Sequence, residues 1–229
     1  MKKGKRYEVS HLEEAQFEPG SRRQVLKNLL GIKTKRVMDA VEEREQFRAL
    51  EELIRLYGPE HRFTTADICN FHKIWLGPIY SWAGQYRQVN LTKGDFPFAA
   101  AGQIPRLMAE FERGPLRQFT PCRFASRDDM ARALAVVHTE FILIHPFREG
   151  NGRVARLLAH LMAAQAGLPL LNFSDLMAGR KRQAYFAAVR AGLDRNYAPM
   201  EEIFSDLIDR ALQARPPSQP SGPGSPTAR

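Results

Sequence analysis

The stretch SRDDMARALAVVHTEFILIHPFREGNGRVARLLAHLMAAQAG, residues 126–167, predicts two buried helices joined by a short polar loop. A capping-box pattern begins at Ser126, and apolar residues follow it at helical spacing. The first helix should end at His145, because the residue before a proline is pushed out of helical geometry. Apolar residues resume at helical spacing after Asn151 and continue to a glycine. We therefore expect residues 145–150 to form a loop held between two buried helices.

In the rest of the chain, apolar residues recur mostly at the spacing of an α-helix. Residues 35–57 predict a long helix that ends at a Gly-Pro pair, and further helices are expected from residue 65 and over 104–111. Residues 86–98 instead alternate around apolar positions and break at Lys-Gly-Asp, which indicates a β-hairpin. A lone hairpin is not stable by itself, so it must lie against another part of the fold. The predicted fold class is all-α with a single β-hairpin.

Composition supports one globular domain with polar ends. The chain has 229 residues, of which 44% are hydrophobic, enough for a substantial core. Residues 1–20 are polar and are expected to be a flexible N-terminal segment. Residues 21–213 should form the domain. Residues 214–229 are rich in Pro, Ser and Gly and should be a disordered tail.

Charge and cysteine content narrow the function classes. The net charge of +9 makes acidic partners worth considering, but the basic residues are scattered apart from residues 179–182, which disfavours a nucleic-acid-binding protein. Two cysteines cannot form a disulfide framework or a closed zinc site. The chain shows no signal peptide and no apolar run long enough to span a membrane. It is expected in the cytoplasm, and a secreted effector would show the same features.

The loop and the start of the second helix carry the residue types of a phosphate site. Gly150 and Gly152 leave backbone N–H groups free to face a ligand where a helix begins, and a helix N-terminus favours anions. Arg153 and Arg156 are three residues apart and should project from one face of the first turns. Forked guanidinium groups suit the binding of phosphates.

A single acid and a single base complete this segment. Glu149 is a carboxylate among phosphate-binding groups, which is best explained by a shared Mg²⁺. His145 has a pKa suited to accepting a proton near neutral pH. A zinc hydrolase using His138, His145 and His160 is disfavoured, because no metal-binding spacing such as H-E-x-x-H is present.

The segment from His145 to Arg156, HPFREGNGRVAR, resembles the signature of the Fic family, His-x-Phe-x-Asp/Glu-Gly-Asn-Gly-Arg-x-x-Arg, at every specified position. Residues 79–87, IYSWAGQYR, resemble another stretch of that family, and residues 91–98 resemble the hairpin flap that covers its active site. The resemblance extends over about residues 24–207. It implies a Fic-type helical domain with a single β-hairpin flap over the active site.

The implied activity is transfer of AMP from Mg²⁺-bound ATP to a Ser, Thr or Tyr hydroxyl of a target protein. By this resemblance His145 is the catalytic general base and Glu149 is the metal ligand. The flap, residues 89–98, would hold the target protein by strand pairing. The implied phosphate-binding residues are Gly150, Asn151 and Gly152 for the α- and β-phosphates, and Arg153 and Arg156 for the outer phosphates.

Two features depart from the family pattern. Tyr185 is similar in position to a tyrosine near the adenine and is counted among the nucleotide-binding residues, but Gly192 stands where an asparagine is often found. Core packing is an equal alternative for Tyr185. Residues 10–14 have the Ser-x-x-x-Glu spacing of the family's inhibitory helix, but Ala15 follows Glu14 in place of Gly or Asn. We therefore expect a separate inhibitor protein, as in toxin–antitoxin members of the family.

Other transfers on the same fold remain open at this stage. Transfer of UMP or of phosphocholine would need no change in the motif. The kinase-type reaction of Doc relatives is disfavoured, because those relatives have lysine at the position of Gly152. The target protein, the modified residue type and the oligomeric state do not follow from the sequence.

Overall fold

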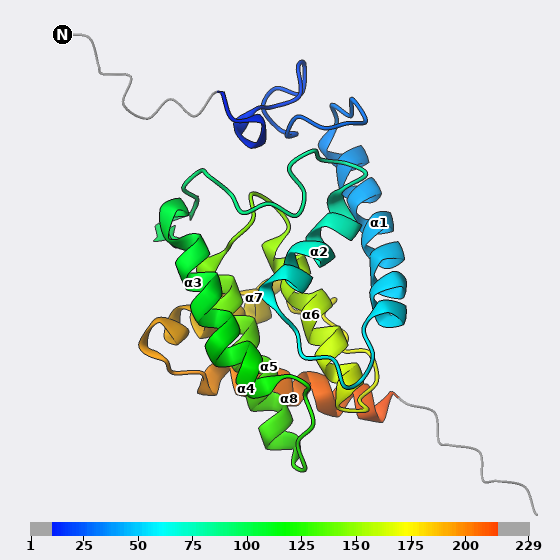
Figure 1. The fold of residues 1–229 in the computed structure, drawn as a ribbon, viewed down its shortest axis with the longest axis vertical. Coiled ribbons are helices and arrows are strands. Elements are labelled where there is room, and N and C mark those ends of the chain that lie inside the picture. Colours follow the sequence, from blue (N-terminus) through cyan, green and yellow to red (C-terminus); the bar gives the residue numbers. More distant parts are fainter. Residues whose placement is uncertain (1–10, 215–229) are drawn as a thin grey trace, which may run out of the picture.

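The structure, a computed structural model, describes residues 11–214. It is a helical fold with one two-stranded antiparallel hairpin, as predicted (Figure 1). Its α-helices and strands are α1 (Lys35–Leu56), α2 (Thr65–Leu76), β1 (Thr92–Lys93), β2 (Phe96–Pro97), α3 (Ile104–Phe111), α4 (Arg117–Phe119), α5 (Arg127–Ile144), α6 (Asn151–Gln165), α7 (Gly179–Ala191) and α8 (Ala198–Gln213). Short 3₁₀ segments lie at Glu13–Ala15, Ala101–Gln103 and Gly192–Asp194, and a π-helical turn lies at Glu112–Leu116.

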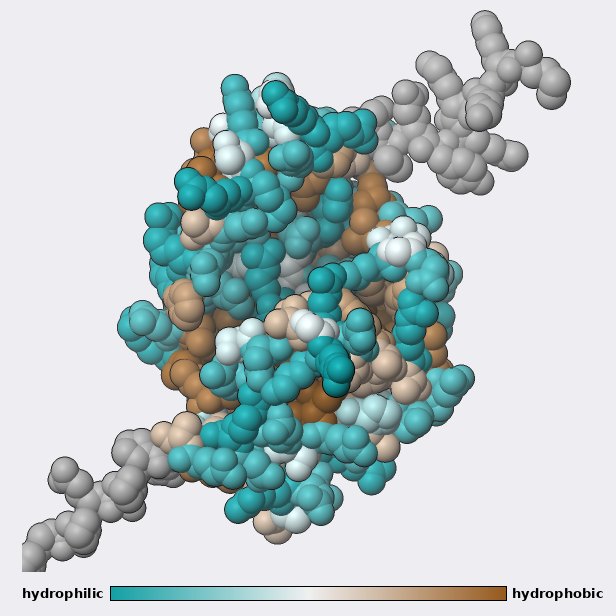
Figure 2. Space-filling model, turned by 180° about the vertical axis from the view of Figure 1, so that it is seen from behind, coloured by the Kyte–Doolittle hydropathy of each residue, from teal (hydrophilic) through white to brown (hydrophobic). Residues whose placement is uncertain are grey.

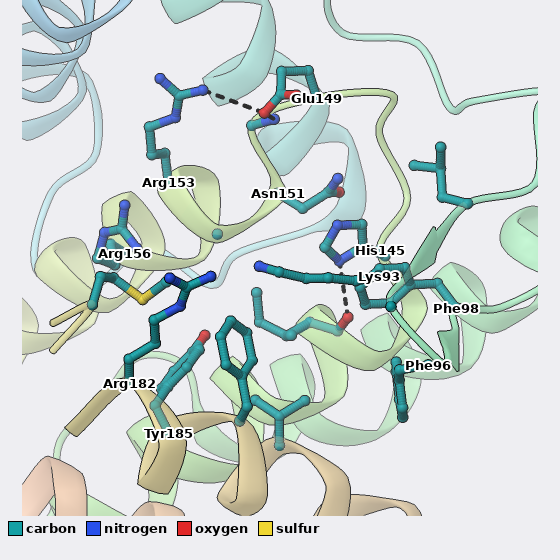
Figure 3. A pocket seen from close by; sticks show the side chains of 18 of the residues that line it. Lys93, Phe96, Phe98, His145, Glu149, Asn151, Arg153, Arg156, Arg182 and Tyr185 are labelled. Carbon is teal, nitrogen blue, oxygen red and sulfur yellow. Dashed lines mark hydrogen bonds and ion pairs between the residues drawn. The ribbon is translucent and has the colours of Figure 1, made fainter. Parts of the chain in front are cut away.

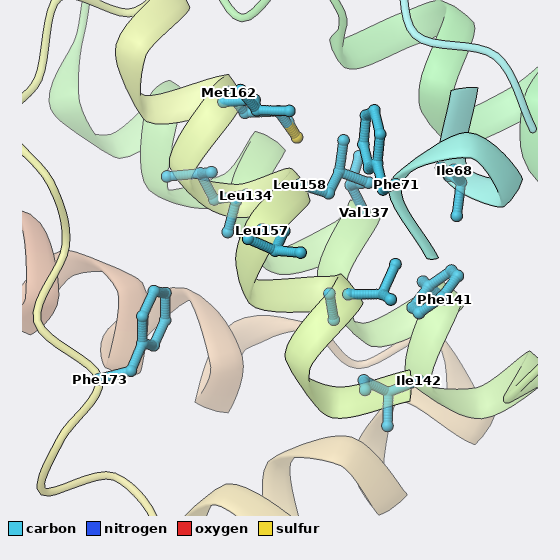
Figure 4. Close-up of a cluster of buried hydrophobic side chains, with 14 of the residues drawn as sticks. Ile68, Phe71, Leu134, Val137, Phe141, Ile142, Leu157, Leu158, Met162 and Phe173 are labelled. Carbon is cyan, nitrogen blue, oxygen red and sulfur yellow. The ribbon is translucent and has the colours of Figure 1, made fainter. Parts of the chain in front are cut away.

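Helix α5 forms the centre of the core. It packs mainly against α8 and α6, and apolar side chains around most of its circumference are buried. Figure 4 shows Leu158 of α6 close to Val137 of α5 and Phe71 of α2, within one buried cluster. Close packing on several sides fixes the end of α5 and the start of α6, and the loop between these two ends is held accordingly.

Both ends of α5 follow the sequence prediction. Ser126 is the N-cap, and its hydroxyl oxygen accepts a hydrogen bond from the Asp129 N–H at 3.0 Å. The helix ends at Ile144, and His145 takes a left-handed conformation with φ of 53°. A non-glycine residue with positive φ is uncommon and is often found at functional sites.

The hairpin is shorter than residues 86–98, because its strands contain only two residues each. Thr92 pairs with Pro97 and Lys93 pairs with Phe96. The expected support comes from α7: the Arg190 guanidinium donates to the Asp95 carboxylate at 2.6 Å.

The N-terminal residues 11–20 differ from the expected flexible segment. The Glu14 side chain is buried, and its Oε1 accepts hydrogen bonds from the N–H groups of Gln88 at 2.7 Å and Val89 at 3.1 Å. Phe17 forms an isolated antiparallel bridge with Leu26. The buried carboxylate and this backbone bridge explain why the polar-looking segment docks on the domain. The predictions for residues 1–10 and 215–229 lie outside the described residues.

The face of the molecule opposite to that of Figure 1 is largely polar. Figure 2 shows hydrophilic side chains over most of the face opposite to that of Figure 1, with a hollow near its middle. Among the described residues, no helix combines the length and the hydropathy that crossing a membrane requires.

Candidate active site

One cavity of about 1210 Å³ brings the predicted site residues together. Its walls come from the loop after α5, the first turns of α6, the hairpin, α7 and the first turns of α1. All eight residues predicted from the sequence line it: His145, Glu149, Gly150, Asn151, Gly152, Arg153, Arg156 and Tyr185.

His145 is held with one nitrogen free for the cavity. Its Nδ1 lies 3.1 Å from the Ile142 carbonyl oxygen. A carbonyl can only accept, so Nδ1 carries the proton and the lone pair lies on Nε2. The Phe98 ring of the hairpin stacks on the imidazole at 3.6 Å with an angle of 13°. Burial lowers the pKa of His145 to about 4, so the imidazole is neutral at physiological pH.

Arg87 ties this histidine to the base of the hairpin, a role that sequence reasoning missed. Its side chain is buried, and Nε donates to the His145 carbonyl oxygen at 2.7 Å. The two terminal nitrogens donate to the carbonyl oxygens of Val89 and Ala99, each at 2.6 Å. One guanidinium therefore fixes the catalytic loop and both ends of the flap. In the sequence, the only hint of this role was the position of Arg87 at the end of the IYSWAGQYR stretch.

The loop itself is braced by aromatic packing. Phe147 is buried and stacks on His72 of α2 at 4.0 Å. The ring of His72 also contacts the loop backbone, because Nε2 lies 3.1 Å from the Glu149 carbonyl oxygen. Gly150 has φ of 82°, and a Cβ there would stand 2.6 Å from Cζ3 of Trp75. Gly150 is thus required both by its left-handed conformation and by its contact with α2.

Asn151 contributes to the site differently from the expectation. Its side chain is buried and bonded to the loop, since Oδ1 accepts from the Phe147 N–H and Nδ2 donates to the Phe147 carbonyl oxygen, both at 2.8 Å. The amide is therefore occupied in shaping the loop. What Asn151 can offer to an anion is its backbone N–H at the start of α6.

Gly152 is in a different situation from Gly150. A Cβ at this position would meet no atom closer than Nη1 of Arg156 at 3.7 Å, and its φ is not positive. Packing of the described residues therefore gives no reason for a glycine here. The open space lies on the cavity side, where a ligand could approach the backbone.

The two arginines of the segment have different surroundings. Arg153 is bound to the buried carboxylate of Glu42 in α1 at 2.7 Å, lies over the Trp75 ring at 4.5 Å and reaches Glu149 at 3.4 Å. Arg156 has no carboxylate partner among residues 11–214. Burial lowers the pKa of Arg156, although a guanidinium stays cationic at neutral pH. Both arginines line the cavity, but the guanidinium of Arg153 is already ion-paired, whereas that of Arg156 has no carboxylate partner within residues 11–214.

The carboxylate of Glu149 is partly committed. Its Oε1 accepts from the Gly150 N–H at 2.9 Å and from Arg153, and the side chain is 45% exposed. The second oxygen, Oε2, has no hydrogen-bond partner among the described residues. The described residues contain no group of three or more His, Cys, Asp or Glu placed to hold a metal.

Tyr185 lines the cavity from α7 but is mostly buried. Its hydroxyl lies 2.9 Å from Nε2 of the buried His138, which fixes the ring. Gly192 explains the missing asparagine nearby, because a Cβ there would stand 2.3 Å from Cγ2 of Thr139. The close approach to α5 leaves no room for a side chain at this point.

Glu14 does not contact Arg156. Its carboxylate is used at the base of the hairpin, and its carbonyl oxygen accepts from Nε of Arg148 at 2.9 Å. An inhibitory helix would place its glutamate against Arg156, and residues 11–14 do not do so. Ser10 lies outside the described residues.

Comparisons with known proteins agree with this architecture. A protein adenylyltransferase of Bartonella henselae is 28% identical over 196 residues, which cover 80% of this chain and 35% of that protein. A probable protein adenylyltransferase Fic of Salmonella typhimurium is 31% identical over 199 residues, which cover 82% of this chain and 90% of that protein. The crystal structure of the BepC protein of Bartonella tribocorum with bound AMPPNP has a TM-score of 0.69 and 26% identity, covering 86% of this chain and 97% of that one.

The relatives differ in length from this chain. The chain spans 35% of the Bartonella henselae protein and 30% of a second Bartonella relative. The sequence model of the Fic/DOC family matches residues 62–163, from just before α2 to the last turn of α6. The Salmonella relative matches over most of both chains. This chain belongs to the Fic/DOC family.

Proposed function

We propose that this protein is an adenylyltransferase that moves AMP from ATP onto a hydroxyl group of a target protein. The observation that carries the proposal is the arrangement of His145, whose Nε2 lone pair is free, in the same cavity as a helix N-terminus and Arg156, which has no carboxylate partner within residues 11–214. A neutral base and an anion site in one cavity suit the attack of a hydroxyl on a phosphate.

The reaction requires one bond to form and one to break. The target hydroxyl oxygen attacks the α-phosphorus, and the bond from that phosphorus to the oxygen bridging to the β-phosphate breaks. Pyrophosphate leaves, and the hydroxyl proton passes to Nε2 of His145. The Ile142 carbonyl bound at Nδ1 favours the resulting imidazolium, as a second hydrogen-bond partner does for catalytic histidines.

Nucleotide binding is supported by the start of α6 and by the relatives. The N–H groups of Asn151 and Gly152 stand in the first turn, where helices have no internal acceptor. Gly152 leaves the backbone open on the cavity side. The Bartonella tribocorum protein binds AMPPNP with the same fold. We infer that the triphosphate of ATP runs from these N–H groups to Arg156.

Glu149 fits a magnesium ion shared with the phosphates. Mg²⁺ in nucleotide enzymes is usually held by one or two carboxylates together with phosphate oxygens. One oxygen of the partly exposed Glu149 is uncommitted and borders the cavity. When bound, the ion would neutralise charge on the phosphates, while this chain's own residues orient the nucleotide and take up the proton.

The hairpin offers a docking place for the target protein. Thr92, Gly94 and Asp95 are exposed, and the Phe98 ring beside them covers His145. An extended target segment pairing with this edge would bring a Ser, Thr or Tyr hydroxyl near Nε2 of His145.

We further propose that control comes from a separate inhibitor protein, as in a toxin–antitoxin pair. This inhibitor would supply a carboxylate to Arg156.

Labelled nucleotides test the proposal directly. The purified chain is incubated with bacterial lysate and Mg²⁺, once with α-labelled and once with γ-labelled ATP. Label from the α-position alone, with a mass increase corresponding to AMP on the modified protein, supports AMP transfer. Label from the γ-position would show a kinase, and a different added mass would show transfer of another group.

A further inference from the structure

Seven cationic side chains line the cavity, and most of them already have a partner. Arg153 binds Glu42, and Arg190 binds Asp95. Lys35 is paired with Asp39, and Arg148 donates to the Glu14 carbonyl oxygen. The remaining three have no carboxylate partner within residues 11–214: Lys93 of the hairpin, Arg156 of α6 and Arg182 of α7. Of these three residues, only Arg156 belongs to the segment that resembles the Fic signature.

Lys93 and Arg182 are brought together by one aromatic ring. The Nζ of Lys93 lies 4.3 Å from the centre of the Phe186 ring, and the guanidinium carbon of Arg182 lies 5.7 Å from it. Figure 3 shows both side chains pointing into the space between His145 and Arg156. The hairpin also contacts α7 through the Arg190–Asp95 pair, on the same side as these two cations.

Lys93 and Arg182 are exposed on the cavity wall, and neither forms an ion pair within residues 11–214, so two like charges stand near one another there. Burial, and then the charge of Arg182, lower the pKa of Lys93, whereas the charge of Glu149 acts in the opposite direction; Lys93 in turn contributes to lowering the pKa of His145. A cation close to the proposed base and another between it and Arg156 mark a place for an anion. The Phe186 ring holds both side chains in position by cation–π contact.

We propose that Lys93 and Arg182, together with the N–H groups at the start of α6, form an anion subsite that binds the phosphoryl group transferred by the enzyme, the α-phosphate of the nucleotide. The inference rests on the proposed function, since it assigns the α-phosphate to the place opposite His145. Arg156 lies deeper along α6 and is left for the outer phosphates. Lys93 then neutralises the charge that develops on the α-phosphoryl oxygens during attack.

The experiment measures equilibrium binding of three probes to the full chain by calorimetry: AMPPNP, AMP and adenosine. The variants are Lys93→Met and Arg182→Gln, with Arg180→Gln as the control, because Arg180 belongs to the same basic tract but does not line the cavity. Each subsite variant should weaken AMP and AMPPNP by about tenfold, the loss expected for one charge-assisted hydrogen bond. Adenosine, which has no phosphate, should bind equally to all forms.

Other outcomes overturn the inference. Unchanged AMP affinity with weakened AMPPNP would place the two cations at the outer phosphates. Unchanged affinity for both, with a raised KM for the target protein alone, would show an acidic target surface as the ligand. Lys93→Arg should retain binding within about threefold, which separates loss of charge from loss of shape. AMP binding is independent of transfer, so its loss in the variants supports the subsite even if the chain transfers another group.

Discussion

Gly150→Ala tests the packing that shapes the catalytic loop. A methyl group at this position meets two obstacles in the structure. The first is the backbone, whose φ of 82° costs an alanine about 1–2 kcal/mol. The second is Cζ3 of Trp75, which a new Cβ would approach to 2.6 Å, about 1 Å closer than an ordinary carbon contact.

Trp75 cannot easily retreat. It is fully buried, its Nε1 donates to the Glu42 carbonyl oxygen at 2.8 Å, and Arg153 covers its ring. Overpacking of such a site costs about 1–3 kcal/mol, so the total loss of unfolding free energy should be about 2–5 kcal/mol. A loop displaced by about 1 Å should also lower AMP transfer on the order of a hundredfold.

Urea denaturation of the variant and the wild type, together with transfer rates at a temperature where both are folded, measures both effects. Gly152→Ala is the stability control, because its Cβ meets nothing closer than 3.7 Å and an alanine favours the helix. Gly152→Ala should be as stable as the wild type or slightly more. A Gly150→Ala variant within about 0.5 kcal/mol of the wild type would refute the packing argument.

Three further predictions follow from single side chains. Glu149→Ala should raise the Mg²⁺ concentration for half-maximal transfer by at least about tenfold, because it removes the carboxylate that borders the phosphates; an unchanged Mg²⁺ titration would place the metal elsewhere. Glu14→Gly should not raise AMP transfer, and should lower the unfolding free energy by about 1–3 kcal/mol, because the N–H groups of Gln88 and Val89 lose their acceptor. A manyfold gain of transfer, measured beside the wild type, would instead make Glu14 an internal inhibitor. The kcat/KM of the wild type should stay level from pH 8 to about pH 5 and fall only towards pH 4, since burial lowers the pKa of His145 to about 4; a midpoint near 6.5 would contradict a buried neutral base.

The same pKa determines the effect of acid on stability. A histidine with a depressed folded pKa binds fewer protons in the native state than in the unfolded chain. Stability contributed by neutral His145 is therefore present above about pH 6.5 and is lost as the pH falls towards 4. Buried His72, whose pKa is also lowered to about 4 by burial, acts in the same direction. Circular dichroism at each pH separates loss of base from loss of fold.

The helices and the loop between α5 and α6 could be predicted from sequence because their signals are local. The start of α5 is marked by the N-cap residue Ser126, and its end by the His145-Pro pair. The spacing of apolar residues between them indicates the helix itself, so each signal lies within or next to the element that it predicts. The hairpin was also predicted, although its strands proved shorter, since Arg87 and Glu14 occupy the backbone groups that precede β1. The fold class was confirmed.

The pairing of Arg153 with Glu42 had no local signal. Glu42 stands in a charged run of α1 that reads as a solvated face, and it is 111 positions before Arg153, so only the packing of α1 beside α6 brings them together. Glu14 was missed for a similar reason, because a polar segment gave no sign of a buried carboxylate. The side-chain role of Asn151 was also hidden, since an asparagine in a glycine-rich loop suits both ligand binding and loop shaping.

The most direct measurement compares wild type with His145→Ala in transfer of α-labelled AMP to a purified target, with AMPPNP affinity determined in parallel. We expect transfer by the wild type, loss of transfer by the variant on the order of a hundredfold or more, and AMPPNP affinity within about threefold of the wild type. The small change in affinity follows because the imidazole contacts Ile142 and Phe98 and acts on the target hydroxyl rather than on the outer phosphates. Normal transfer by folded His145→Ala would contradict the assignment of the catalytic base.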